Sequence, residues 1–444
     1  MEQKHKTLIY NARLVDAEMD RAGSALLVSD GKIERLLTGE EAAPVVRAAG
    51  TDGTELFDAQ GQVVMPAFID MHAHFRDPGL TQKEDLESGS WAAAAGGFGT
   101  LVLMPNTNPV VSSQEAACAN NRRGVQIGLA NLFQAVSITR DFGGKDISHL
   151  DGLDRKIVPL ITEDGHEVQD SAVMYEAMTI AARRGIIVSC HCEDPFLAAA
   201  ARPLRKAALE ELAKGNREEA AKILARADEL LRLAEDTATD RNIRLAAAAG
   251  CHLHLCHVST AHCLESAMRA KKAGQELSLE VTPHHIGLTG SSMPDIFNIV
   301  NPPLRAEEDR QALIAALIRG EADVVATDHA PHTMQDKKSG SPGFSGLETA
   351  FAVCHTNLVQ KGGMELRALS ARMSATPASL LSLGDRGLLK EGYRADLAVL
   401  DTGRSWTVRG EAFYSKGKFS PWENRELTGK VTACFHGGRK VYGS

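Results

Sequence analysis

Apolar runs that look like buried strands alternate with alanine-rich helical segments along most of this 444-residue chain. Strands that alternate with helices are typical of an α/β architecture with a parallel sheet. Eight such strands close most simply into a (β/α)8 barrel, which we predict here. We expect the strands at 63–71, 99–104, 126–132, 157–161, 186–192, 252–258, 277–281 and 323–327.

The two ends of the chain have a different sequence pattern from its middle. Residues 7–57 read as short strands separated by turns, and residues 395–401 and 430–438 read as strands with a glycine turn. Because the chain exceeds the usual size of one domain, a second domain is expected. We predict that both ends together build one small β-sandwich domain. The predicted division is 1–58 and 387–444 for the β domain and 59–386 for the barrel.

The overall composition argues against several classes of partner. A net charge of −8 argues against nucleic acid. No apolar leader follows the charged residues 1–6 and no run approaches the length of a membrane span, so we expect a cytoplasmic protein. The eight cysteines lack a framework spacing, which favours reduced thiols. Cys190 and Cys192 flank His191, but on a strand they point to the opposite face, so we interpret them as packing residues.

The most informative local motif is the stretch 70–76, which follows the first apolar run. It contains His72 and His74, and two histidines two apart on a strand point the same way. Two imidazoles aimed at one point suit a catalytic metal ion. A single His-x-His pair also arises by chance, so the interpretation depends on the polar clusters farther along the chain.

Further polar clusters follow the ends of the later strands. Each cluster also has a purely structural interpretation. Asn106 beside prolines could form an Asx-turn, and Asp164 before glycine could be a turn residue. His257 could be a hydrogen-bonded core histidine, and Asp328 could cap a helix. In a barrel, however, strand ends meet at one mouth. Burying four histidines and two carboxylates there without a metal would cost several kcal/mol. Nitrogen and carboxylate ligands without thiolate favour zinc. The clusters include His72, His74, Arg76, Asn106, Asp164, His191, His257, Asp328 and His332.

The order of these motifs resembles the amidohydrolase superfamily and, within it, the bacterial dihydroorotases of the longer, two-domain type. The resemblance covers nearly the whole chain, and its motifs together are highly specific. They are Asp70-Met71-His72-Ala73-His74-Phe75-Arg76, Met104-Pro105-Asn106-Thr107, His191-Cys192-Glu193-Asp194, His257-Val258-Ser259-Thr260, Val281-Thr282-Pro283-His284-His285, Asn301-Pro302-Pro303-Leu304-Arg305, Ala326-Thr327-Asp328-His329-Ala330-Pro331-His332 and Gly346-Leu347-Glu348-Thr349.

The resemblance implies a site with one or two zinc ions per chain. The bridge between the ions would be Asp164, since no lysine follows the fourth strand, although its neighbour Glu163 is the alternative. The implied ligands are His72, His74 and Asp328 for one ion and His191 and His257 for the second.

The implied reaction is the reversible cyclisation of N-carbamoyl-L-aspartate to L-dihydroorotate, a step of de novo pyrimidine (UMP) biosynthesis. The metal would lower the pKa of a bound water toward ~7, so that hydroxide becomes available as the nucleophile. Asp328 would act as the general acid and base. The substrate-binding residues implied are Arg76, Asn106 and His332 at the carboxylate, Asn301 at the ring, and also His74. The order Pro342-Gly343-Phe344 replaces the family's usual Pro-Phe-Gly.

Two other functions remain open at this stage. A hydantoinase-like or allantoinase-like cyclic amide hydrolase would use a carboxylated lysine bridge, and this chain has none at that place. A catalytically silent scaffold, for example for aspartate transcarbamoylase, would have lost metal ligands, which this chain keeps. The resemblance also implies a homodimer and leaves association with aspartate transcarbamoylase open.

Overall fold

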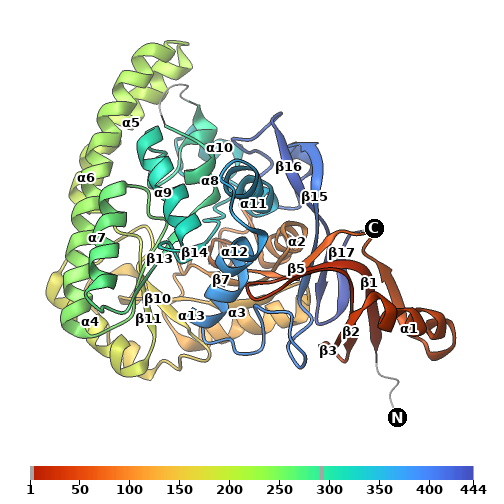
Figure 1. Ribbon diagram of the computed structural model, residues 1–444. Helices are drawn as coiled ribbons and strands as arrows, with labels where there is room; N and C mark the ends of the chain where they lie inside the picture. The colour runs from red at the N-terminus through yellow and green to blue at the C-terminus, as the bar shows by residue number, and fades with distance from the viewer. Residues whose placement is uncertain (1–4, 291–294, 444) are drawn as a thin grey trace.

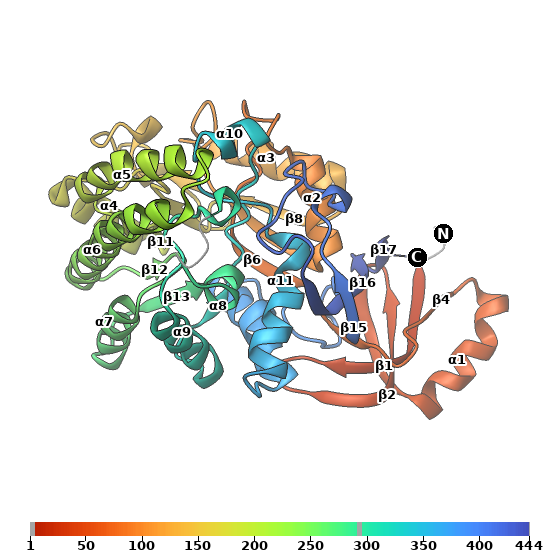
Figure 2. The same ribbon diagram turned by 90° about the horizontal axis from the view of Figure 1, so that it is seen from above.

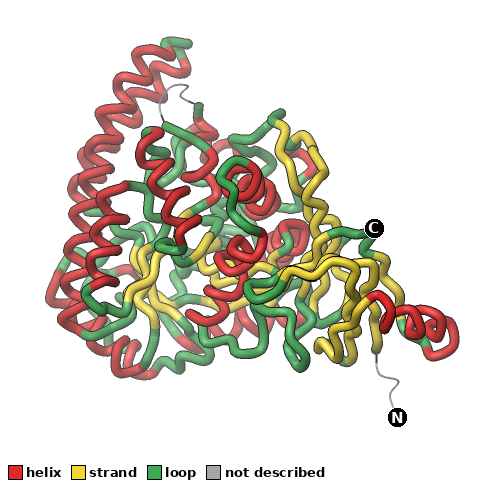
Figure 3. The backbone as a smooth tube through the Cα atoms, viewed as in Figure 1, coloured by secondary structure: helices red, strands yellow, loops and turns green. Residues whose placement is uncertain are grey.

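The computed structural model describes residues 5–290 and 295–443. Residues 1–4 therefore lie outside the described part. They are the first residues of the predicted β domain and belong to the N-terminal stretch in which we expect no apolar leader. A helix-rich body with a barrel at its centre lies beside a domain of strands that contains both ends of the chain (Figures 1 and 3). This arrangement confirms the predicted fold class.

The barrel contains two hydrogen-bonded sheets whose strands run parallel. β8 and β9 are separated by Ala135 and occupy one strand position, because β8 pairs with β7 while β9 pairs with β10. A parallel bridge from Ala73 to His329 joins the first strand to the segment after the last, so eight strand positions form a closed ring. The strands are β6 Phe68–Ala73, β7 Phe98–Leu103, β8 Asn131–Gln134, β9 Val136–Ser137, β10 Leu160–Thr162, β11 Ile187–Cys190, β12 Leu253–Leu255, β13 Leu277–Val281 and β14 Val324–Val325.

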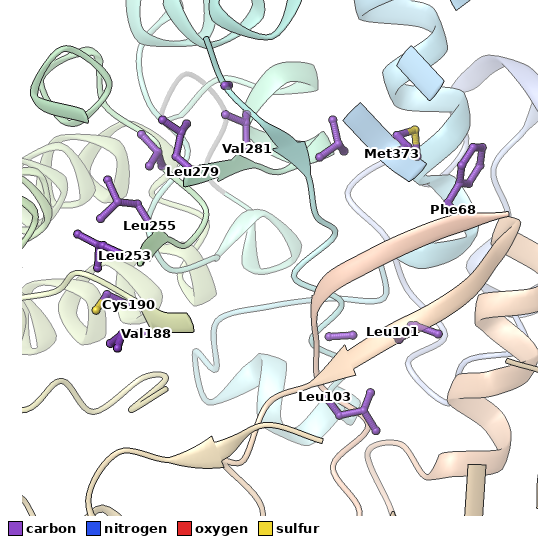
Figure 4. Close-up of a cluster of buried hydrophobic side chains, with 14 of the residues drawn as sticks. Phe68, Leu101, Leu103, Val188, Cys190, Leu253, Leu255, Leu279, Val281 and Met373 are labelled. Atoms are coloured by element: carbon purple, nitrogen blue, oxygen red, sulfur yellow. The ribbon is translucent and has the colours of Figure 1, made fainter. Parts of the chain in front are cut away.

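Helices cover the outside of the barrel, and α5 and α6 form a long pair along one side (Figure 2). Apolar side chains of β11, β12 and β13, among them Val188, Leu253 and Leu279, fill the layer between strands and helices (Figure 4). Cys190 belongs to this layer, which confirms it as a packing residue. The helices are α2 Leu86–Gly96, α3 Gln114–Ile127, α4 Ser171–Arg184, α5 Pro195–Ala213, α6 Arg217–Ala249, α7 Ala261–Lys272, α8 Pro283–Gly287, α9 Glu307–Arg319, α10 Met334–Lys338, α11 Leu347–Cys354, α12 Leu366–Ser370 and α13 Thr376–Leu380.

None of the helices within residues 5–290 and 295–443 combines the length and the apolarity that crossing a bilayer requires. α6 is the longest of them, but charged side chains recur along its whole length.

The strands of the β domain form one hydrogen-bonded sheet in the order β17-β16-β15-β5-β1-β2-β3, with β4 paired to β1. β5 lies between β1, to which it is parallel, and β15, to which it is antiparallel. Both ends of the chain therefore build this domain, as predicted. Its elements are β1 Lys6–Val15, β2 Asp20–Ser29, β3 Lys32–Thr38, α1 Gly39–Asp52, β4 Glu55–Asp58, β5 Val63–Pro66, β15 Leu397–Thr407, β16 Glu426–His436 and β17 Arg439–Tyr442.

Three details of the expected secondary structure were wrong. The run 63–71 is two strands in different sheets, because the chain leaves β5 and enters β6 through Ala67. The strand expected at 126–132 begins only at Asn131, since α3 continues to Ile127. Residues 7–57 include helix α1, which starts with a capping box between Thr38 and Glu41. The capping box signals the start of a helix, but the strand-like segments on either side of it led to the prediction of strands.

Candidate metal centre and active site

A cavity of about 230 Å³ opens at the C-terminal end of the barrel strands. In a parallel barrel this is the end where side chains from different strands converge. The cavity brings together most of the residues that the sequence motifs predicted for the site. Its lining includes His74, Arg76, Asn106, Asp164, His191, His257, Asn301, Asp328 and His332, together with Ser341, Pro342 and Gly343.

His72 is buried at the end of β6, and a carboxylate on a distant strand fixes its ring. Its Nδ1 lies 2.8 Å from Oε1 of Glu280 on β13. Since a carboxylate only accepts, Nδ1 carries the proton and the Nε2 lone pair faces the cavity. That Nε2 lies 3.4 Å from Oδ1 of Asp164 and 3.6 Å from Oδ1 of Asp328, and it has no hydrogen-bond partner among the described residues. Three acceptor atoms therefore converge without a donor between them.

The orientation of His74 follows from the same reasoning, through Asn106. The amide nitrogen of Asn106 donates to Oδ2 of Asp164 at 2.8 Å, so its amide oxygen faces Nδ1 of His74 at 2.9 Å. Nδ1 of His74 is then the donor. Its Nε2 lone pair consequently faces Oδ1 of Asp328 at 3.1 Å. Two acceptors this close need a positive charge between them, which a metal ion supplies.

A second pair of imidazoles lies on the other side of Asp164. Nδ1 of His191 and Nε2 of His257 point at each other across 2.9 Å. Nδ1 of His191 is also 3.6 Å from Oδ1 of Asp164, the atom that faces His72 on its other side. Asp164 thus lies between the two histidine pairs.

Glu163 does not belong to this cluster. Its carboxylate turns away from the cavity and accepts hydrogen bonds from the backbone N–H and the hydroxyl of Thr139. Burial raises the pKa of Glu163 to about 7 in spite of these bonds. The geometry therefore favours Asp164 over Glu163 as the carboxylate that faces the histidines.

The electrostatics of the cluster favour cations. Burial alone would raise the pKa of Asp328, but the contact with His74 and the nearby imidazoles of His72 and His257 hold it well below its usual value. Burial lowers the pKa of His191, yet Glu193 and the two aspartates outweigh burial and raise it to about 9. Burial, aided by His191 and His72, lowers the pKa of His257 to about 3, which leaves a neutral imidazole. The ionised carboxylates and the neutral imidazole of His257 are suitable donors for a divalent metal, which would take the place of the proton on His191.

Three triads in the described residues come close enough together to hold an ion. One contains His72, Asp164 and His257, and a second contains His72, His74 and Asp328, with ligand atoms within 4.8 Å of one another. A third contains His72, Cys256 and Glu280. Burial raises the pKa of Cys256 to about 12, so its sulfur stays a thiol and is a poor ligand. The first two triads fit a metal ion, and the third does not.

Backbone strain coincides with the site residues. Arg76, His257 and Asp328 have positive φ angles of 56°, 32° and 47°. Such conformations cost about 1–3 kcal/mol each for residues other than glycine and persist only where the surroundings enforce them. The strand ends are therefore bent to aim these side chains into the cavity.

Loops form the rest of the cavity wall, which we call the loop wall. Arg76 extends toward His332, whose Nε2 donates to the carbonyl of Pro342 at 2.8 Å. Within residues 5–290 and 295–443, the Nε of Arg76 has no hydrogen-bond partner. A guanidinium with an unused donor beside a cavity suits a carboxylate of a ligand.

Asn301 completes the loop wall from a third segment. Its amide nitrogen donates to Glu193 and lies 3.4 Å from Nε2 of His191. Arg205 of α5 supports Asn301 from behind, with bonds of 3.4 Å to its Oδ1 and 3.2 Å to the carbonyl of Val300.

Sequence reasoning missed three residues that support the site. Glu280 accepts hydrogen bonds from His72, from His254 at 3.0 Å and from the backbone of His257 at 3.0 Å. Its signal was a carboxylate inside the otherwise apolar strand 277–281. Glu193 stood in a recognised motif without a role, and Lys337 gave no local signal.

Comparison with known proteins identifies the family. A model described as the amidohydrolase family matches residues 63–441. A dihydroorotase of Clostridium botulinum is 39% identical over 436 residues, which cover 98% of this chain and 99% of that protein. A dihydroorotase of Bacillus cytotoxicus is 35% identical over 442 residues, with 98% of each chain covered.

Solved structures agree with the fold. An L-hydantoinase (dihydropyrimidinase) from Arthrobacter aurescens has a TM-score of 0.85 at 25% identity and covers 98% of this chain and 96% of its own. A dihydropyrimidinase from Brevibacillus agri has a TM-score of 0.81 at 22% identity, covering 99% and 95%. Sequence relatives over the full length and a shared barrel with its β domain lead to one conclusion: the chain belongs to the amidohydrolase family and, within it, to the dihydroorotases.

Proposed function

We propose that this protein catalyses the reversible cyclisation of N-carbamoyl-L-aspartate to L-dihydroorotate in de novo pyrimidine biosynthesis, with bound zinc. The observation that carries the proposal is the pairing of two features in one cavity. Imidazole and carboxylate acceptors converge at this cavity, and the half-buried guanidinium of Arg76 also lines it. A cyclic amide that bears a carboxylate would meet both.

The residues present would hold zinc without a thiolate. His72, His74 and Asp328 would hold one ion, His191 and His257 would hold a second, and Asp164 would bridge them. Bound zinc supplies a Lewis acid that polarises the carbonyl and makes water acidic near neutral pH.

Asp328 would move the proton in both directions. Its low pKa keeps it ionised and ready to accept a proton from the attacking water in the hydrolytic direction. It would then return that proton to the leaving ring nitrogen. The strained backbone at Asp328 holds its carboxylate toward both the cluster and the cavity.

The loop wall would orient the substrate. Arg76 offers two parallel N–H groups that match a carboxylate. Asn106 has one amide N–H left after its bond to Asp164, and His332 lies beside Arg76, so both can assist. Asn301 would contact the ring, and His74 lies between the metal cluster and the bound carboxylate.

A hydantoinase-like activity on neutral cyclic amides is the second candidate, since the solved structure of highest similarity given above is an L-hydantoinase. Arg76 argues against it, because its half-buried cation would be left without a partner if it faced a neutral ring.

Metal analysis combined with activity tests the proposal. We expect one to two zinc ions per chain and turnover of both N-carbamoyl-L-aspartate and L-dihydroorotate, without dependence on bicarbonate. Active protein that contains no divalent metal, or zinc-loaded protein that is inactive on both compounds, would refute it.

The adjacent carboxylates provide a matched pair of variants. Asp164→Ala should lose the second zinc ion and most activity, whereas Glu163→Ala should retain both, because Glu163 turns toward Thr139. The opposite pattern would show that Glu163 is the bridge.

We also propose a cytoplasmic homodimer. The cytoplasmic location is supported by the cysteines, all eight of which are free thiols. Light scattering of the purified protein tests the dimer, and co-elution with aspartate transcarbamoylase tests the proposed association with that enzyme.

A further inference from the structure

Lys337 is completely buried on the short helix α10, just beyond the loop wall of the cavity. Its ammonium group donates to three backbone carbonyls. They belong to Ile299 at 3.1 Å, Ser341 at 2.9 Å and Gly343 at 2.9 Å. An ammonium has three N–H groups, so each of them has a partner.

These carbonyls belong to two segments that line the substrate side of the cavity. Ser341 and Gly343 lie in the loop 341–343, and Ile299 precedes Asn301 by two residues. The backbone N–H of Gly343 also donates to the carbonyl of Ile299 at 2.9 Å. The ammonium of Lys337 therefore binds both segments at the place where they meet, which we call the junction.

The junction controls where two substrate-facing side chains lie. The carbonyl of Pro342, between the two loop residues that bind Lys337, accepts the hydrogen bond from His332. Asn301 follows directly on the segment held at Ile299. A shift of the junction would thus move His332 and Asn301 together, while β6 and β13 keep His72 and Glu280 in place.

Close packing of the loop's own backbone also contributes to the position of the junction. Gly343 has a φ of 113°, and a Cβ there would lie 2.6 Å from the Cβ of Ala330. The loop therefore packs closely through its backbone. Burial, helped by the charge of Arg205, lowers the pKa of Lys337 to about 7, which shows that keeping the charge here costs free energy. An apolar side chain would fill the space without that cost.

We propose that Lys337 is a positioning residue for substrate binding: its ammonium joins the loop 341–343 to the segment 299–301 and thereby sets the affinity for the carboxylate-bearing substrate. The proposal rests on the proposed dihydroorotase reaction and extends it to a residue outside the cavity. It separates substrate affinity from the metal chemistry, since the three hydrogen bonds of the Lys337 ammonium go to carbonyls beside the cavity and not to the candidate metal ligands.

The test compares Lys337→Met and the milder Lys337→Gln with Lys338→Met, which changes the exposed neighbour on the same helix. We expect KM for N-carbamoyl-L-aspartate to rise about tenfold in Lys337→Met, the loss of a hydrogen-bonded charge, with kcat within about twofold. Lys338→Met should resemble wild type. Zinc content should be equal in all four proteins.

A purely structural role gives another pattern. Misfolded or destabilised protein would lower kcat per chain and zinc content together at unchanged KM. That result, or an unchanged KM in a folded Lys337→Met, would overturn the proposal.

Hydrogen exchange provides a readout that does not need activity. In Lys337→Gln, amides of 296–301 and 341–345 should exchange at least about tenfold faster, while those of β6 and β13 stay as in wild type. Equal exchange would refute the junction. If wild-type zinc protein proved inactive on both compounds, the proposed function would fail, yet the exchange experiment would still decide whether Lys337 holds the wall.

Discussion

The two walls of the cavity are held in different ways. On the metal side, His72 and His257 come from strand ends and are fixed by the buried carboxylate of Glu280. On the loop side, His332 donates to the carbonyl of Pro342. Lys337 and Arg205 donate to the carbonyls of Gly343 and Val300, which adjoin Pro342 and Asn301. The metal wall is thus fixed through side chains on a rigid barrel, and the loop wall through the main chain. Changes to one wall should therefore alter the chemical step, and changes to the other should alter substrate affinity.

The largest effect is expected at Asp328, on the metal wall. Asp328→Asn keeps the shape of the side chain but cannot accept and return a proton. We expect kcat to fall by roughly 10²–10⁴-fold, measured by steady-state kinetics in both directions. Circular dichroism should show an unchanged fold. Near-normal turnover would mean that another group, with His332 first among them, is the base.

Arg76 tests the loop wall most directly. Arg76→Met leaves the substrate carboxylate without its partner, a loss of roughly 2–5 kcal/mol, or about 30-fold to several thousand-fold in kcat/KM for L-dihydroorotate. Arg76→Lys should also fail, because an ammonium lacks the planar pair of donors.

Neutral dihydrouracil is the control substrate for the Arg76 variants. Any activity toward it should change little. Equal losses on both substrates, or a wild-type preference for the neutral ring, would favour the hydantoinase-like alternative.

Glu280 should affect the metal wall without touching the substrate. The amide of Glu280→Gln cannot accept from His72, His254 and the His257 backbone at once. We expect zinc affinity to fall about 10–100-fold, measured by competition with a chelator, with little change in KM once zinc saturates the protein. Glu276→Gln, at an exposed position just before the same strand, is the matched control. Unchanged zinc affinity would show that the strand alone orients the histidines.

The smallest effect is expected at Arg205, which supports Asn301 through two long hydrogen bonds. Arg205→Met should raise KM by about three- to tenfold and leave kcat and zinc content unchanged. Arg202→Met, on the exposed side of α5, should have no effect. A fall in kcat at constant KM in Arg205→Met would contradict the expectation that changes to the loop wall alter substrate affinity and not the chemical step.

The metal wall could be predicted from the sequence because its residues occur at strand ends. The two-residue spacing of His72 and His74 places both on one face of a strand, and Asp328 follows another apolar run. The structure brings all of them to one cavity. The choice between Asp164 and Glu163 needed coordinates, since Thr139, the partner of Glu163, lies on a different loop.

The supports behind the walls could not be predicted in this way. Lys337 lies in a polar stretch, and only folding reveals that its acceptors come from two distant segments. Glu280 was visible as a charge within an apolar strand, but its partners on β6 and β12 were not. Helix α1 was missed because its Thr38–Glu41 capping box stands between strands, where local alternation dominated the interpretation.

The passage through Ala67 has a consequence for the order in which the protein is made. β5 ends at Pro66 and β6, which carries His72, begins at Phe68, while β5 is flanked by β1 and by β15. A ribosome delivers residues 397–407 long after His72 and His74. Until they arrive, the strand that leads into His72 and His74 lacks one of its two neighbours. We therefore expect the proposed zinc ions to bind late, after the C-terminal strands have emerged. Truncated translation products should then bind no zinc.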